Sequence, residues 1–136
     1  MKKSSISSLK TKLDRVFSEF IRLRDADKNG YCRCISCGKL VHWKDCDAGH
    51  YVNRKHMSLR YDEMNVNAQC RACNRFDEGN MLGYNRGLVK KYGALVNIIS
   101  YLEIKKGNTC KMGVFEYEVL IKDYQKKVKE LKDSKL

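Results

Sequence analysis

Long apolar runs are the first feature that this sequence lacks. The lysines at residues 2–3 are not followed by the run of roughly 7–15 apolar residues that marks a secretory signal. The most apolar stretch, residues 94–102, is too short to span a bilayer and is interrupted by Asn97 and Ser100. Proline, internal repeats and low-complexity segments are absent as well. We therefore expect a soluble, cytoplasmic protein without membrane association.

Acidic residues are scarce relative to basic ones. The chain has 16 Asp and Glu against 28 Lys and Arg, and the resulting net charge of +12 is spread over all thirds of the sequence. Such a charge favours a polyanionic partner, most simply nucleic acid, although a basic surface that only keeps the protein soluble is the alternative. A chain of 136 residues can bury one modest core, so we expect one domain with helical attachments.

Two amphipathic segments flank a central region of different character. Apolar residues recur at alternating steps of three and four near both ends, which predicts helices over about residues 5–25 and 114–131. Residues 31–74 lose this spacing and collect β-forming residues, which predicts short strands. Each long helix must bury its apolar stripe. The stripes pack either on one another or on a second subunit, which would make a homodimer through the flanking helices.

Shorter helical patterns follow the strand region. Apolar spacing predicts one helix over residues 81–92, ended by Gly93, and another from Leu95 to Ile104, before a break at Gly107. We accordingly divide the chain into an N-terminal amphipathic helix at 1–28, a core at 29–93 and a C-terminal helical extension at 94–136.

Seven cysteines are an odd number and, in a reducing compartment, poor material for disulfides. Two pairs have CxxC spacing, and four thiolates complete a closed tetrahedral zinc site of the structural kind. These predicted ligands are Cys34, Cys37, Cys70 and Cys73. The string "CRCISC" also leaves open that Cys32 replaces one of the first pair. Gly38 favours a knuckle turn because glycine tolerates positive φ, whereas Cys46 and Cys110 are expected to be small, partly buried apolar residues.

The segment between the two cysteine pairs carries a recognisable order of polar residues. The strings "DAGHYV" and "NVNAQCRACN" place His50, Asn65 and Asn74 in an order and spacing that resemble the HNH endonucleases, which are ββα-metal nucleases. The longer pattern "CRCISCGK…DAGHYVNR…LRYDEMNVNAQCRACN…GN…Y…GL…YG" resembles the bacteriophage NinG (lambda Rap) recombination protein family. That resemblance covers most of the chain from Tyr31 to Gly93.

The resemblance implies roles that elementary chemistry supports. Histidine is the side chain whose ordinary pKa suits removal of a proton from water near neutral pH, so His50 is expected to be the general base. Phosphodiester hydrolysis also needs a divalent cation to stabilise developing charge. Asn74 is expected to offer a side-chain oxygen to Mg²⁺ or another divalent cation. Asn65 corresponds to the middle residue of the motif, whose implied role is to hold the histidine-bearing loop in place.

A second ligand for the catalytic cation is harder to assign. Many HNH enzymes have an acidic or histidine ligand directly before the catalytic histidine, whereas this chain has Gly49 there and Asp47 two residues earlier. Side chains three apart face opposite sides of a regular strand, so we expect a bulge at Gly49 if Asp47 is the ligand. Cationic residues around the site are expected to contact DNA phosphates. They are Arg54, Lys55, Arg60, Arg71 and Arg75.

These observations predict an α+β fold: a small zinc-stapled ββα-metal (HNH-like) core flanked by α-helices at both ends. The resemblance implies a metal-dependent DNA endonuclease acting on branched recombination intermediates such as Holliday junctions and D-loops, in a bacterial cell that carries phage or prophage. The alternative is a zinc-containing DNA-binding protein without hydrolytic activity. An assembly module acting through the two long helices is a third reading.

Overall fold

The first helix follows directly from the apolar spacing at the start of the chain. The computed structural model describes residues 5–93 and 97–136. Helix α1 (Ile6–Asp25) begins after Ser5, whose Oγ accepts a hydrogen bond from the Ser8 amide at 3.1 Å. Such an N-cap satisfies one of the free amides of the first turn. The predicted helix over residues 5–25 is confirmed.

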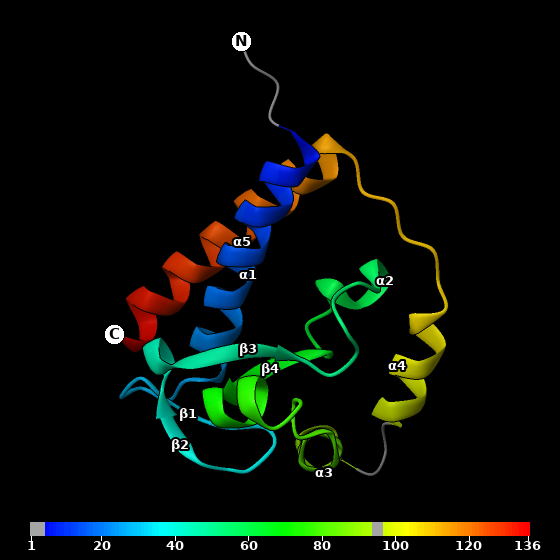
Figure 1. Cartoon of the computed structure of the whole chain (residues 1–136). Helices are drawn as coiled ribbons and strands as arrows, with labels where there is room; N and C mark the ends of the chain where they lie inside the picture. Colours follow the sequence, from blue (N-terminus) through cyan, green and yellow to red (C-terminus); the bar gives the residue numbers. More distant parts are fainter. Residues whose placement is uncertain (1–4, 94–96) are drawn as a thin grey trace.

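The last helix, α5 (Val114–Lys135), lies alongside α1 (Figure 1). The ring of Tyr124 packs against those of Phe17 and Phe20, with centroids 5.0 Å apart in both pairs. At the far end, Lys135 Nζ donates to the carbonyl oxygens of Leu23, Arg24 and Ala26, where α1 ends. The two apolar stripes therefore cover one another within one chain. The homodimer stays a prediction. The apolar stripes of α1 and α5 are not available for it, because they are buried against each other.

Short strands fill the central region, as predicted. Strands β1 (Tyr31–Arg33) and β2 (Leu40–His42) form one antiparallel pair, and the short helix η1 (Trp43–Asp45) follows. Strands β3 (Cys46–His50) and β4 (Val66–Cys70) form a second antiparallel pair, joined by a loop that contains the short helix α2 (Met57–Arg60). A single π-type turn, η2 (Ala72–Phe76), follows β4.

Two further helices complete the chain. Helix α3 (Met81–Tyr92) ends at Gly93, whose φ of 79° permits the reversal there, as predicted. Helix α4 (Ile98–Lys106) matches the described part of the second predicted helix, whose expected start at Leu95 lies outside the described residues. No helix in the described ranges has the length and apolar character needed to cross a membrane.

The β3–β4 pair lies between two sets of elements. In Figure 1, α1 and α5 lie above it, and α3 and the β1–β2 pair lie below. The larger core contains residues from all three segments of the sequence division, including Leu13, Val66 and Tyr117, which are at most 1% exposed. A smaller core joins α2, α3 and α4 through Leu59, Leu88 and Leu102. The fold is mixed α+β, and the long helices are parts of its packed body.

Candidate functional site

Four cysteines gather where the β1–β2 turn meets the end of β4. The Sγ atoms of Cys34, Cys37, Cys70 and Cys73 all lie within 4.8 Å of one another. Cys37 Sγ and Cys70 Sγ are 3.8 Å apart, which matches the separation of about 3.8 Å expected from tetrahedral geometry and Zn–S bonds of about 2.3 Å. The donor set fits a metal ion such as zinc. Cys32 is not part of this cluster and instead donates its thiol to the Arg22 carbonyl oxygen at 3.2 Å, which favours Cys34 and Cys37 over the alternative set with Cys32.

A glycine turn and two hydrogen bonds shape the cysteine cluster. Gly38 has a φ of 78°, which confirms the positive value predicted for the knuckle turn. The Cys73 amide donates to Cys70 Sγ, and Asn80 Nδ2 donates to Cys73 Sγ, each at 3.4 Å. Hydrogen bonds of this kind orient thiolate ligands around an ion. Outside the cluster, Cys46 is buried and Cys110 is partly buried, as predicted.

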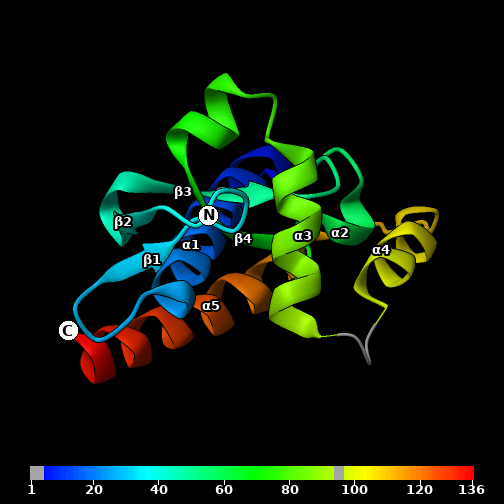
Figure 2. The ribbon, with the colours of Figure 1, turned by 90° about the horizontal axis from the view of Figure 1, so that it is seen from below.

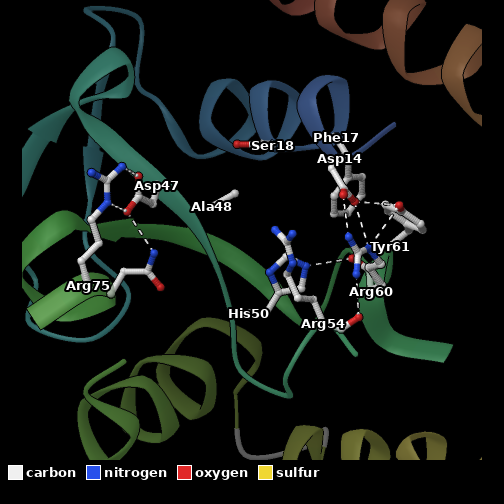
Figure 3. A pocket seen from close by; sticks show the side chains of 11 residues that line it. Asp14, Phe17, Ser18, Asp47, Ala48, His50, Arg54, Arg60, Tyr61 and Arg75 are labelled. Atoms are coloured by element: carbon white, nitrogen blue, oxygen red, sulfur yellow. Dashed lines mark hydrogen bonds and ion pairs between the residues drawn. The ribbon is translucent and has the colours of Figure 1, made fainter. Parts of the chain in front are cut away.

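Three of the predicted site residues, Asp47, His50 and Asn74, border one pocket of about 270 Å³, whereas Asn65 does not line it (Figure 3). Its walls come from α1, β3, η2 and the loop that carries α2. The residues that line it are Asp14, Phe17, Ser18, Asp47, Ala48, His50, Arg54, Arg60, Tyr61, Asn74 and Arg75. Figure 3 shows His50 beside Arg54, and Asp47 facing Arg75 further along β3. Tertiary folding thus brings Asp47, His50 and Asn74 to one cavity.

His50 is oriented by the backbone of α2. Its Nε2 lies 2.9 Å from the carbonyl oxygen of Arg60. A carbonyl oxygen can only accept, so Nε2 carries a proton, and Nδ1 holds the free lone pair when the ring is neutral. Burial, together with the positive charges of Arg54 and Arg60, lowers the pKa of His50 below its ordinary value of 6.5, although the Arg60 carbonyl acts in the opposite direction. The neutral ring is therefore the main form at pH 7.

Asn65 is completely buried and braces the loop between His50 and α2. Its Oδ1 accepts from the Val52 amide at 2.8 Å, and its Nδ2 donates to the carbonyl oxygens of Val52 and Leu59 at 3.1 Å. Leu59 directly precedes the residue whose carbonyl holds His50. These contacts are those expected of a residue that holds the histidine-bearing loop in place, while its importance for catalysis stays a prediction.

Asp47 and Asn74 meet at the other end of the pocket. Asn74 Nδ2 donates to Asp47 Oδ2 at 2.9 Å, and Arg75 donates to both Asp47 oxygens at 2.8 Å. Burial of Asp47 opposes ionisation, but the hydrogen bonds from Arg75 and Asn74 outweigh it and hold the pKa of this carboxyl below its ordinary value. The site therefore brings together a carboxylate and an amide, and it keeps the carboxylate ionised.

The bulge predicted at Gly49 is wrong. Pairing of β3 with β4 runs without interruption, with Gly49 opposite Asn67 and His50 opposite Val66. Glycine is needed there because a Cβ atom would lie 1.9 Å from Oε1 of the buried Gln69. Asp47 and His50 do start from opposite faces of the strand. Both reach the pocket because β3 pairs on one side only, and the cavity lies along its unpaired edge.

The five predicted DNA contacts differ in their environments. Arg54, Lys55, Arg71 and Arg75 are exposed, whereas Arg60 is only 8% exposed. Arg60 Nε donates to Asp14 Oδ1 at 2.9 Å, in an ion pair that joins α2 to α1. Since a phosphate contact would break this buried pair, Arg60 supports the pocket wall and does not offer a free cation.

The sequence analysis did not identify Asp14 and Tyr61 as residues of the pocket wall. Asp14 accepts hydrogen bonds from Arg60 and from the hydroxyl of Tyr61, the latter at 2.7 Å. The partners are 46 and 47 residues away along the chain, so no local spacing connects them. The one available cue was an acidic residue next to the buried Leu13 in the first helix.

Comparison with known proteins places this architecture in a family. A sequence model described as "Bacteriophage Lambda NinG protein" matches residues 1–134. "Protein ninG" of Salmonella phage P22 is 38% identical over 120 residues, which cover 85% of this chain and 54% of that protein. "Protein ninG" of Escherichia phage lambda is 34% identical over 119 residues, which cover 85% and 53%. The chain thus spans about half the length of these relatives, and no solved structure matches it. This chain belongs to the bacteriophage lambda NinG family.

Proposed function

We propose that this protein is a metal-dependent DNA endonuclease of the HNH type. The observation that carries the proposal is the convergence of His50, Asp47 and Asn74 on one pocket bordered by exposed cations. The order β3, β4, η2 follows the strand–strand–helix order of a ββα-metal core, although η2 is a single turn. The high positive charge and the family resemblance favour DNA, and the resemblance favours branched recombination intermediates such as Holliday junctions and D-loops.

His50 has the geometry of a general base. The Arg60 carbonyl holds the Nε2 proton, which leaves Nδ1 to accept a proton from a water molecule in the pocket. Because the lowered pKa keeps the ring neutral at pH 7, this lone pair is available without a preceding deprotonation. Asn65 keeps the loop and its carbonyl in position.

Asp47 and Asn74 are the residues that would hold the divalent cation. Both side chains contain oxygen atoms, the ligands that Mg²⁺ prefers, and Asn74 Nδ2 lies 2.9 Å from Asp47 Oδ2. A bound cation would supply charge stabilisation to the phosphodiester during its hydrolysis. Two adjustments are required of the protein: Arg75 must release Asp47, and the Asn74 amide must turn to present Oδ1. The Arg75 side chain is 53% exposed, so it can swing out toward a DNA phosphate.

The bidentate contact of Arg75 with Asp47 also favours a second candidate function. If Arg75 remains in place, the carboxylate is already neutralised and no cation is needed there. The protein would then be a zinc-containing DNA-binding protein without hydrolytic activity.

Cleavage of a synthetic four-way junction with Mg²⁺ or Mn²⁺ distinguishes the two. We expect His50→Ala to lower the single-turnover rate at least about 100-fold, because a general base is lost. His56→Ala is the matched control, since His56 does not line the pocket and should retain the rate. Undiminished cleavage by His50→Ala would refute the base assignment.

Cation binding provides a readout that is independent of activity. Titration of Mn²⁺ followed by electron paramagnetic resonance should show a site in the wild type that Asp47→Asn weakens. Arg75→Gln should preserve or strengthen this site, because the competing guanidinium is removed. Junction binding without cleavage, together with no Mn²⁺ site in either the wild type or Arg75→Gln, would favour the non-catalytic alternative.

A further inference from the structure

A second concavity, larger than the catalytic pocket, has no part in the proposed chemistry. It measures about 810 Å³ and lies between the β1–β2 unit and α3, with the end of α1 and part of β4 at its base. In the view from below, α3 stands beside β4, and β1 and β2 lie further to the left (Figure 2). We call this concavity the α3 groove. His50 and Ala48 point toward α1, whereas Asn67, which lines the groove, bonds Tyr84 of α3, so the two sites lie on opposite sides of the β3–β4 pair.

One wall of the α3 groove is apolar and aromatic. Tyr31 and Leu40, from β1 and β2, are 43% and 51% exposed, and Ile35 lies between them in the sequence. The Tyr31 ring is held edge-on against the His42 ring, with centroids 5.4 Å apart. A fixed, exposed aromatic ring offers a flat surface on which an unpaired base can stack.

Uncompensated positive charge borders the same groove. Arg33 extends from the β1 side, and Arg86 and Lys90, four residues apart on α3, extend from the other. All three are exposed, and none takes part in an ion pair within the described residues. The lining also has two carboxylates: Asp25 pairs with Arg24 and with Lys91, which lines the groove too, and Asp27 accepts backbone amides of its own turn. Arg33, Arg86 and Lys90 therefore leave the lining with an excess of positive charge.

The groove is built into the fold. Helix α3 meets the turn at residues 35–36 through two glycines, where Cβ atoms would come within 2.2 Å of the Ser36 oxygen at Gly83 and 1.9 Å of the Ile35 oxygen at Gly87. Side chains at these positions would force the helix away from the turn. The close contact fixes the separation of the two walls, so binding requires little reorganisation.

We propose that the α3 groove binds an unpaired DNA strand, with a base on Tyr31 and phosphates on Arg33, Arg86 and Lys90. The combination of an aromatic platform and a cationic border favours single-stranded DNA over duplex, whose bases are stacked inside and whose exterior is phosphate. A branched substrate offers both kinds of DNA, so one strand can occupy the catalytic pocket while an unpaired strand occupies the opposite side. The proposal rests on the proposed function for the choice of DNA as the polyanion.

Fluorescence anisotropy with labelled oligo-dT and a blunt duplex of equal length, without divalent cations, tests the charges. The triple variant Arg33→Gln, Arg86→Gln, Lys90→Gln should weaken oligo-dT binding about tenfold or more, and should weaken duplex binding much less. A matched variant removes three exposed charges from α5 and should change oligo-dT binding less than about threefold. Its substitutions are Lys122→Gln, Lys126→Gln and Lys129→Gln.

Substitution of Tyr31 tests stacking. Tyr31→Ala should weaken oligo-dT binding about fivefold or more, whereas Tyr31→Phe, which keeps the ring, should change it less than about twofold. Circular dichroism and zinc content establish that each variant is folded. Equal losses with the two triple variants, or equal losses for oligo-dT and duplex, would overturn the proposal. So would light scattering that shows a dimer dissociated by Tyr31→Ala, since a second copy would then fill the groove.

The outcome is separable from that of the nuclease proposal. His50→Ala lies outside the groove and should bind oligo-dT as the wild type does. Full cleavage by His50→Ala refutes the catalytic assignment and leaves the groove result standing. Unchanged oligo-dT binding by the triple variant of Arg33, Arg86 and Lys90 refutes the proposal that the α3 groove binds single-stranded DNA, and leaves the nuclease proposal standing.

Discussion

Single side chains acquire their chemistry here from groups that are remote in the sequence. The imidazole of His50 is held by the carbonyl of Arg60, and the loop that carries this carbonyl is held by Asn65. A lone histidine in a polar stretch is most often a surface residue, and the flanking motif was the reason to consider it. The hydrogen bond to the Arg60 carbonyl determines which tautomer the neutral His50 ring adopts, and no sequence pattern specifies this.

The lowered pKa of His50 predicts the pH dependence of cleavage. As pH falls through the folded-state pKa, the ring gains a proton and can no longer act as a base. The midpoint of the acidic limb of the single-turnover rate should therefore lie below pH 6.5. His56→Ala should show the same limb as the wild type. A midpoint above pH 6.5 would contradict the burial effect.

The lowered pKa of His50 also makes the free energy of unfolding depend on pH. The unfolded chain takes up a proton on His50 near its ordinary value of 6.5, whereas the folded chain takes it up at lower pH. Between the two values the unfolded state binds more protons, so the free energy of unfolding decreases as pH falls through that window. The contribution is fully present above pH 6.5.

At the scale of elements, Gly49 in β3 is required by packing against the neighbouring strand and not by a bulge in the backbone. A glycine directly before His50 suggested a bulge, yet the strand is regular and Gly49 has no positive φ. Glycine is required at position 49 because the side-chain amide of Gln69, on the neighbouring strand, lies over it. Gln69 Nε2 donates to Ser36 Oγ at 2.9 Å and to the Gly79 carbonyl oxygen at 2.6 Å, so the amide cannot move away freely.

Gly49→Ala should consequently destabilise the protein. The added methyl group would collide with the fixed Gln69 amide, and overpacking of this kind costs about 1–3 kcal/mol of unfolding free energy, measured by urea denaturation. Gly107→Ala is the control, because the nearest atom to its Cβ would be 3.7 Å away, and its stability should be unchanged or slightly higher. The double variant with Gln69→Ala should recover part of the loss. Equal stability of Gly49→Ala and the wild type would contradict the clash.

At the scale of the whole molecule, the four-cysteine cluster joins parts that are remote in the chain. It connects the β1–β2 turn, through Cys34 and Cys37, to the end of β4 and the start of η2, through Cys70 and Cys73. The pocket at His50 and the α3 groove each use an element adjacent to the cluster. Loss of a metal ion held by these cysteines should therefore affect the whole chain.

Cys37→Ser tests this connection with little loss of packing, because Cys37 is exposed. Metal analysis should find about one zinc per chain in the wild type and much less in the variant. The midpoint of thermal unfolding should fall by about 10 °C or more, since binding of a structural zinc ion contributes to folding free energy. Cys110→Ser lies outside the cluster and should retain both values. Full zinc content in Cys37→Ser would exclude this ligand set.

The sequence by itself determined the helices, the strand region and the four cysteines that cluster. These features depend on spacing within a few residues of one another, such as the apolar steps of α1 and α5 and the two CxxC pairs. Local spacing also placed His50, Asn65 and Asn74 in a recognisable order.

Only the tertiary structure decided how these parts meet. It placed α1 on α5, paired Asp14 with Arg60, set Gln69 over Gly49 and opened a groove beside α3. Each of these contacts joins residues that are about 20 or more positions apart. The physical reason is that such contacts depend on how whole helices and strands pack, because shape, burial and charge must be satisfied together. The spacing of residues along the chain does not specify which elements pack against one another.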